Sequence, residues 1–441
     1  MYRYGQETFL LIVPLLLTDS GVVSREISIF FICNHQEPSF ASTCLFAPVM
    51  EVPSRAVLKD RIVSAEATVK LQTAAPNFPI DIHVDRSPDV NSAAVALRVS
   101  RGFVVRIVGP LLIMFFTGAA AELALRLPSI ERTLPIPGRG IGLSTLDVNA
   151  ELNERFVARE GGVDCIFIGD SSVHRGIDPE QFSRTVEELT GRRVRAFLLT
   201  TGGVPPEGKR LLIQLALRHQ PQMIVYGVSS EVAGRTFRDP HADIMQTNAW
   251  VRYKLGEFSI VGWLIENSRT VQYALLFRNV CRGSKFVEEW HKRVGMQVGR
   301  DITRCGFQPS VRTLRPGDPL IIDREINDPA LIRSSIRSAC ACARNVPVLF
   351  LSLPIHPSAF IGKESQEAYS QCKRTLDSAA AACGSRHWSC SMSGLSDEFW
   401  QDRRHLNARG AEVFTRRFAE RFAEEILSEK LRLSTPSGGS P

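Results

Sequence analysis

The sequence predicts an α/β protein built on a parallel sheet with helices on both faces. Residues 163–168 form an apolar run of β-branched and aromatic residues, which is typical of a strand buried on both sides. Similar runs recur along the C-terminal part of the chain, and each is followed by a helical pattern. Strands that alternate with helices in this way indicate a parallel sheet. The apolar share of 44% is ample for a buried core.

The elements follow one another from residue 163 onward. Helix 179–190 begins with Pro179 at its first position and stops at Gly191. Between 239 and 328 the alternation breaks down, and a helical insertion at about 240–328 is predicted to form a cap or lid near the site. The predicted elements are strand 163–168, helix 179–190, strand 194–199, helix 207–219, strand 222–228, helix 330–344, strand 346–353, helix 364–382 and helix 408–429.

The domain organisation places a membrane helix before this α/β domain. Residues 103–126 are strongly apolar, and no charge occurs from 107 to 121, so the segment is long enough to span a bilayer. Arginines are slightly more frequent before it than after it, which favours a cytoplasmic N-terminus. The alternative is a buried core helix of a soluble protein.

The remaining segments are assigned by composition. Residues 1–102 receive no assigned structure, and from about 51 to 99 they show no sustained period, which is compatible with poor order. Residues 127–150 are predicted to be a linker because Pro and Gly are frequent there. The domain itself covers 151–430, and 431–441 is a disordered tail.

Charge and cysteine usage exclude several classes of protein. The net charge is +7, but no basic block with interleaved aromatics is present, so nucleic acid is not an expected partner. The ten cysteines show no zinc-binding spacing, and no cofactor motif occurs, so we expect neither a metal nor a cofactor. Disulfide pairing in an oxidising compartment and unpaired thiols both remain open.

Two short motifs mark the candidate site. Gly-Asp-Ser-Ser at 169–172 closes the first strand, and Asp-x-x-His at 402–405, followed by Leu-Asn, precedes the last helix. A strand that stops at a glycine presents the next side chains at the carboxyl edge of the sheet, where open α/β folds bind ligands. In this order the motifs suggest a serine nucleophile with its acid–base partner.

This pair of motifs resembles the SGNH (GDSL-type) hydrolase superfamily, whose first block is Gly-Asp-Ser and whose last is Asp-x-x-His. The resemblance is closest to membrane-anchored SGNH-like proteins of bacterial exopolysaccharide O-acetylation, through these blocks, Gly-Ile-Asp-Pro at 176–179, and Gly410 after His-Leu-Asn. It covers residues 160–428 and implies a three-layer α/β/α, flavodoxin-like sheet.

The candidate catalytic residues are Ser171, His405 and Asp402. A serine hydroxyl needs a base within hydrogen-bond reach, and an imidazole can take its proton near neutral pH. Asp402, three residues before His405, is suited to orient the imidazole and stabilise its charged form. The bland alternatives are an ordinary turn at 169–172 and a surface histidine at 405.

The oxyanion donors are the backbone N–H groups of Ser171 and of Gly202 or Gly203, which follow the second strand. In the superfamily a third donor is an Asn after the third strand, and here that place reads Gly-Val-Ser-Ser-Glu at 227–231. Ser229 is the candidate substitute, and Ser230 is a second possibility.

Four further residues are candidate substrate contacts because they stand close to the nucleophile or at a strand end. Asp170 precedes the nucleophile, His174 and Arg175 follow it, and His356 ends the fourth predicted strand. For the residues beside the nucleophile, solvent exposure is an equally good explanation.

These features together predict a serine acyl esterase or O-acetyltransferase, held in the cell inner membrane by one helix, with its C-terminal domain outside the cytoplasm. The expected partners are an acylated polysaccharide or other acyl ester, the membrane, and other proteins of polysaccharide modification. Two alternatives are a catalytically inactive SGNH-like scaffold protein of such a complex and a soluble hydrolase.

Overall fold

The computed structural model describes residues 108–131, 133–141, 144–228, 240–281, 302–315, 328–360, 362–390, 392, 394–431 and 433. The chain divides into two compact units, and all of these residues belong to the second, Arg98–Pro441. The predicted segment 1–102, the first residues of the predicted membrane helix, and almost all of the predicted tail lie outside the described residues.

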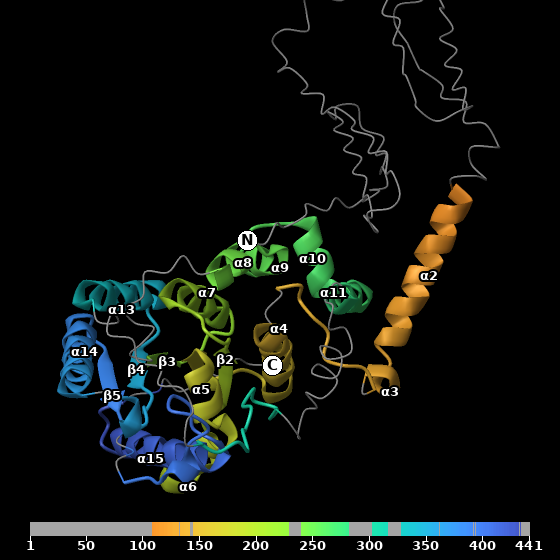
Figure 1. The fold of residues 1–441 in the computed structure, drawn as a ribbon. Coiled ribbons are helices and arrows are strands. Elements are labelled where there is room, and N and C mark those ends of the chain that lie inside the picture. Colours follow the sequence, from red (N-terminus) through yellow and green to blue (C-terminus); the bar gives the residue numbers. More distant parts are fainter. Residues whose placement is uncertain are drawn as a thin grey trace, which may run out of the picture. The chain divides into compact units, whose positions relative to one another are not determined.

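A five-stranded parallel sheet forms the centre of this unit, as predicted (Figure 1). Its strands lie in the order β2-β1-β3-β4-β5, and every neighbouring pair is parallel. This is the strand order of flavodoxin-like sheets, whose direction of winding reverses between β1 and β3 and whose ligands bind at that point. The strands are β1 (Cys165–Gly169), β2 (Ala196–Thr200), β3 (Met223–Val228), β4 (Val348–Ser352) and β5 (Arg386–Ser389).

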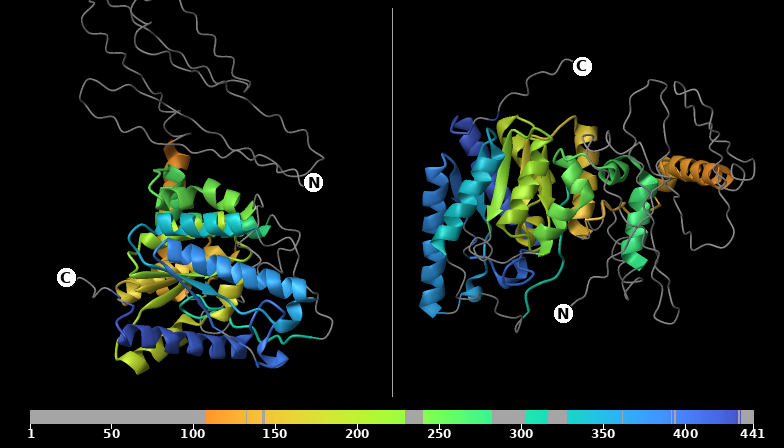
Figure 2. Two further views of the ribbon diagram at one scale, coloured as in Figure 1. Left: turned by 90° about the vertical axis from the view of Figure 1, so that its left-hand side faces the viewer. Right: turned by 90° about the horizontal axis from the view of Figure 1, so that it is seen from above.

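Helices cover both faces of the sheet. The turned view in Figure 2 (left) shows α15 beneath the strands, on the side opposite α13 and α14. The apolar side chains divide accordingly into two core clusters, one on each face of the sheet. One face carries α4 (Ser144–Glu160), α7 (Pro206–Leu217), α13 (Pro329–Ala343) and α14 (Gly362–Ala382), and the other carries α6 (Pro179–Thr190) and α15 (Ala408–Leu427).

An aromatic cluster fixes α15 to the sheet. Phe418 of α15 lies 5.4 Å from the ring of Phe182 on α6 and 6.0 Å from that of Phe167 on β1. All three rings are fully buried, and burying a large apolar side chain stabilises the fold by roughly 1.5–3 kcal/mol. The segment just before α15 therefore has a fixed place beside the end of β1.

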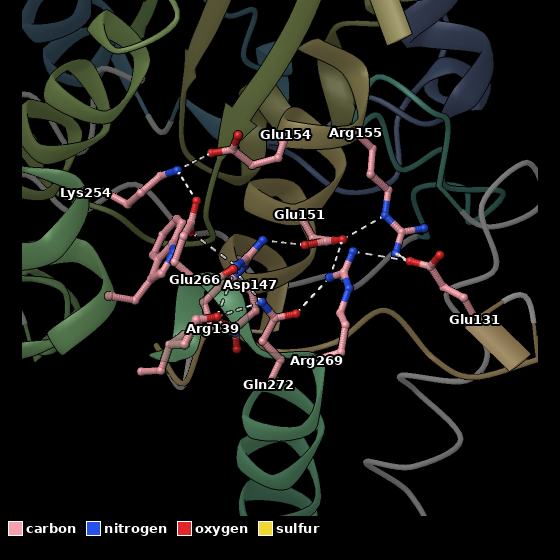
Figure 3. A network of polar contacts seen from close by, with 12 residues as sticks. Glu131, Arg139, Asp147, Glu151, Glu154, Arg155, Lys254, Glu266, Arg269 and Gln272 are labelled. Carbon is pink, nitrogen blue, oxygen red and sulfur yellow. Dashed lines mark hydrogen bonds and ion pairs between the residues drawn. The ribbon is translucent and has the colours of Figure 1, made fainter. Parts of the chain in front are cut away.

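The predicted insertion at 240–328 is helical, but its described part does not form one cap. Helices α8 (Pro240–Thr247), α9 (Ala249–Lys254), α10 (Ile260–Asn267) and α11 (Arg269–Cys281) lie on the outer side of α7, away from α15 (Figure 1). A partly buried network of ion pairs joins α9 and α11 to α4 (Figure 3), with Lys254 paired to Glu154 at 2.7 Å and Arg269 to Glu151 at 2.8 Å. Within the described part of the insertion, the segment 302–315 runs toward the motif loops, where Ser310 and Leu314 bond to Ala408 and Trp400.

The segment predicted as a linker, 127–150, is largely part of the fold. Helix α3 (Pro128–Glu131) lies within it, and α4 begins at Ser144. The carboxylate of Asp147 accepts hydrogen bonds from the backbone N–H groups of Arg139 and Ile141, and Ile141 is fully buried. Residues 135–141 belong to no helix or strand, so their burial leaves no periodic pattern in the sequence.

The apolar helix α2 (Gly109–Leu125) contains no buried residue. No helix among the described residues meets the length and hydropathy needed to cross a membrane. The last turns of α2 are bonded to the junction of α10 and α11, where Arg126 donates to the carbonyl of Asn267 at 2.6 Å.

Candidate active site

The first motif forms a tight turn between β1 and the short helix α5 (Ser171–Gly176). Asp170 caps this helix, because its Oδ1 accepts a hydrogen bond from the backbone N–H of Ser172 at 2.9 Å. A Cβ at Gly169 would lie 2.1 Å from the side chain of Val173, so only glycine fits there. The turn places Ser171 at the carboxyl edge of β1, beside the point where the winding of the sheet reverses.

The second motif forms a closed loop in front of α15. An antiparallel bridge joins Trp400 to Leu406, and the side chain of Asn407 caps α15 by accepting from the backbone N–H of Gly410. Within the loop, Asp402 Oδ1 accepts from the backbone N–H of Arg404 at 2.8 Å and of His405 at 2.9 Å. Both of these bonds are made within the loop itself.

The two loops bring Ser171, His405 and Asp402 together, although the serine and the histidine are 234 positions apart. Ser171 Oγ lies 2.9 Å from His405 Nε2, and His405 Nδ1 lies 2.8 Å from Asp402 Oδ2. These are hydrogen-bond distances for a nucleophile, its base and the group that orients the base. The arrangement can remove a proton from the serine hydroxyl and return it to a leaving group.

The pKa of Asp402 is lowered to about 2. Burial acts to raise this pKa, but hydrogen bonding to His405, its charge, and the two backbone N–H groups outweigh burial. The carboxylate is therefore ionised at neutral pH, as a group that stabilises an imidazolium must be.

We expect Asp402→Asn to lower kcat for ester cleavage by about 10⁴-fold, as in other serine triads, because an amide does not favour the required imidazole tautomer.

The depressed pKa of Asp402 also predicts a pH-dependent loss of stability. The carboxylate stabilises the fold fully above its ordinary pKa of 3.8, and this contribution disappears as the pH falls toward 2. Urea unfolding should show the variant about 1–2 kcal/mol less stable at pH 7. Equal stability at pH 7 would contradict the assigned bonds.

A buried ion pair, which was not predicted from the sequence, lies directly behind the nucleophile. Lys209 of α7 donates to Asp170 Oδ2 at 3.2 Å and to the carbonyl of Gly227 at 3.0 Å. Its ammonium group also lies 5.3 Å from the ring centre of Tyr226, and the side chain is almost fully buried. One cation therefore ties Asp170, the cap of α5, to the end of β3. The sequence signal for it was that Lys209 precedes the buried Ile213 by four residues, which places both side chains on the same face of α7.

The predicted oxyanion donors are placed unequally. Thr200 of β2 is the register partner of Gly169, so Gly202 follows β2 just as Ser171 follows β1. A side chain at Gly202 would meet nothing within 4 Å, which leaves its backbone accessible. Gly203 is exposed and has a φ of 65°, which favours glycine. Ser171 is the first residue of α5, where the backbone N–H has no partner within the helix. Ser229 lies outside the described residues.

All four predicted substrate contacts lie among the described residues, and their surroundings differ from one another. Asp170 is buried and bonded as described above. His174 is buried on α5, and burial lowers its pKa to about 4. Burial also lowers the pKa of Arg175, and the charge of Asp402 in the triad acts to raise it. His356 lies behind the loop 400–406, which carries His405 and is called the base loop below. Its Nε2 lies 3.1 Å from Asp397 Oδ1, and its backbone N–H donates to the carbonyl of Arg403. His356 thus supports the loop that carries His405.

The segment 302–315 frames the site, and it is the part of the predicted insertion 240–328 that lies beside the motif loops. The carbonyl of Cys305 accepts from the backbone N–H of Leu198 in β2, and that of Ser310 accepts from Ala408 at the start of α15. The segment therefore links the outer strand of the sheet to the base loop.

The described residues contain no cluster of three or more His, Cys, Asp or Glu side chains that could hold a metal ion. Cys165, Cys305, Cys372 and Cys390 are free thiols, and burial raises the pKa of each. None of these four thiols is poised as a nucleophile.

The comparisons with known proteins add little to this geometry. No protein-family model matches the chain, and no curated protein matches it. A solved structure that does match is a gut microbial diltiazem-metabolizing enzyme, at 10% identity and a TM-score of 0.28. The match covers 59% of this chain and 46% of that enzyme, so the chain spans less than half of its length. A likeness at this level carries no argument about activity.

Proposed function

We propose that the chain is a membrane-anchored SGNH-like serine acyl esterase or O-acetyltransferase that acts on O-acyl groups of a cell-surface or secreted bacterial polysaccharide. The observation that carries this proposal is the unbroken hydrogen-bonded row from Ser171 Oγ through His405 to Asp402. The Gly-Asp-Ser turn on a sheet with the strand order β2-β1-β3-β4-β5 supports the SGNH-like part of it.

In the proposed reaction, Ser171 Oγ attacks the acyl carbonyl while its proton passes to His405 Nε2. The backbone N–H groups of Ser171 and Gly202 stabilise the resulting oxyanion. His405 then donates the proton to the departing sugar oxygen, which leaves an acyl-enzyme. Water as the second acceptor completes hydrolysis, and a sugar hydroxyl completes transfer.

The membrane part of the proposal places α2 and the residues before it in the cell inner membrane, with the α/β domain outside the cytoplasm. It is supported by the apolar sequence of 103–126 and by the exposure of the large apolar side chains of α2.

Fluorophosphonate labelling of the full chain in detergent tests the chemistry. We expect one labelled serine in the wild type and no label in Ser171→Ala or His405→Ala. A folded wild-type protein that takes no label would contradict the proposal. Acetylated oligosaccharide, added with and without a second, unacetylated oligosaccharide, then separates transfer from release of acetate.

One observation favours a second candidate, a catalytically inactive scaffold protein of a polysaccharide-modifying complex. The Asn that the superfamily carries after the third strand is absent from 227–231. Loss of one oxyanion donor costs on the order of 10²–10³-fold in rate. Unchanged polysaccharide acetylation in cells that carry Ser171→Ala would support this candidate.

A further inference from the structure

A cluster of large apolar side chains is exposed at the start of α10. We name Phe258, Ile260, Val261 and Trp263 the α10 patch; each is between 47% and 77% exposed. Large apolar side chains that are exposed together on a folded domain mark a site of interaction. On the opposite side of the same helix, Ile265 is buried.

The α10 patch is held firmly by the residues beneath it. A Cβ at Gly262 would lie 2.4 Å from the carbonyl oxygen of Ala249, so α10 packs directly on α9. Glu266 of α10 accepts from Trp250 Nε1 at 2.6 Å and from Lys254 Nζ at 2.7 Å, and both donors lie on α9 (Figure 3). The exposure therefore belongs to a packed element rather than to a frayed chain end.

The helix α10 is joined to α2 at its junction with α11. Glu122 accepts hydrogen bonds from Ser268 Oγ at 2.8 Å and from the backbone N–H groups of Arg269 and Thr270 at 2.9 Å each. Ser268 lies between α10 and α11, and Arg269 and Thr270 are the first residues of α11. The eight residues of α10 span about 12 Å at 1.5 Å each, so the patch begins within that distance of the end of α2.

The apolar side chains of α2 are exposed in the same way as those of the patch. Leu112, Ile113, Met114, Phe115 and Phe116 are each at least 50% exposed. The exposed side chains of α2 and the α10 patch are therefore two apolar surfaces joined at the polar junction around Glu122, and both favour an apolar environment. Trp263, with an apolar body and an N–H group, is the type of residue that gathers where lipid meets water.

We propose that the α10 patch inserts into the interfacial layer of the lipid bilayer beside α2, as a second membrane contact. This inference rests on the membrane anchorage in the proposed function and adds a contact that the sequence of 103–126 does not contain. Insertion of 5–10 Å, the usual depth of an interfacial helix, is sufficient to cover the patch. The ion-pair network between α9–α11 and α4 then holds the catalytic domain in a fixed orientation above the membrane.

The test uses the full chain in liposomes of phosphatidylcholine and phosphatidylglycerol, part of which carry bromine on the acyl chains. Bromine quenches tryptophan fluorescence only at short range. We expect Trp263→Phe to remove most of the quenchable intensity. Trp388→Phe is the matched control, because Trp388 is buried under α15, and it should leave the quenching unchanged.

Flotation of the same liposomes separates the failure of this inference from that of the anchorage. If the chain floats with the lipid but Trp263→Phe and the wild type are quenched equally, the α10 patch does not contact lipid and the inference is wrong. If the chain does not float, the anchorage and this inference both fail.

Discussion

Replacing Ser171 with alanine should lower the rate of ester hydrolysis by about 10⁴–10⁶-fold, the range expected when a triad loses its nucleophile. Ser171 Oγ is the atom that lies 2.9 Å from His405 Nε2, and alanine leaves the base without a proton to remove. The measurement is the steady-state hydrolysis of an activated aryl acetate by the full chain in detergent.

The neighbouring serine supplies the matched control for this experiment. Ser172 contributes its backbone N–H to the cap formed by Asp170, and that bond survives in Ser172→Ala. We therefore expect Ser172→Ala to retain activity within a few fold. If both variants lose activity equally, the loss reflects the turn and not the nucleophile, and the assignment of Ser171 is wrong.

Replacing Lys209 with methionine should destabilise the protein by about 3–5 kcal/mol, because it leaves the carboxylate of Asp170 buried without its cation. Removing one partner of a buried pair costs far more than the pair itself contributes. Activity should fall as well, since Asp170 caps the helix that begins with Ser171. Urea unfolding and aryl acetate hydrolysis give the two readings.

The double variant Asp170→Asn/Lys209→Met distinguishes an unpaired charge from lost packing. Both members of the double variant are neutral, so we expect it to be more stable than Lys209→Met alone. If the double variant is instead less stable than Lys209→Met by the full cost of Asp170→Asn, the two residues do not interact, which contradicts the 3.2 Å contact.

Elements with a continuous apolar run or a capped helical period were predictable. Helix 179–190 was predicted with the bounds observed, because Pro179 and Gly191 mark its two ends. Strand β5 was missed because it is an edge strand in which only Trp388 is buried. Helix α4 was missed because the Pro and Gly residues before it led its first turns to be assigned to a linker.

For the site, the sequence by itself determined the chemical groups and the loops that carry them. Gly169 and Asp170 form a tight turn from local bonds, and Asp402 orients His405 across three residues, so both arrangements follow from short-range chemistry. That local order is why both motifs were recognisable in one dimension.

Only the tertiary structure decided which groups meet. The contact of Ser171 with His405 depends on α15 packing against β1 through buried aromatic rings, and the pairing of Lys209 with Asp170 depends on α7 crossing the end of β3. Such contacts join residues far apart in the chain, and packing of the whole core selects them. No local pattern encodes them, which is why the role of Lys209 emerged only from the folded chain, as did the choice of 302–315 as the part of the insertion beside the site.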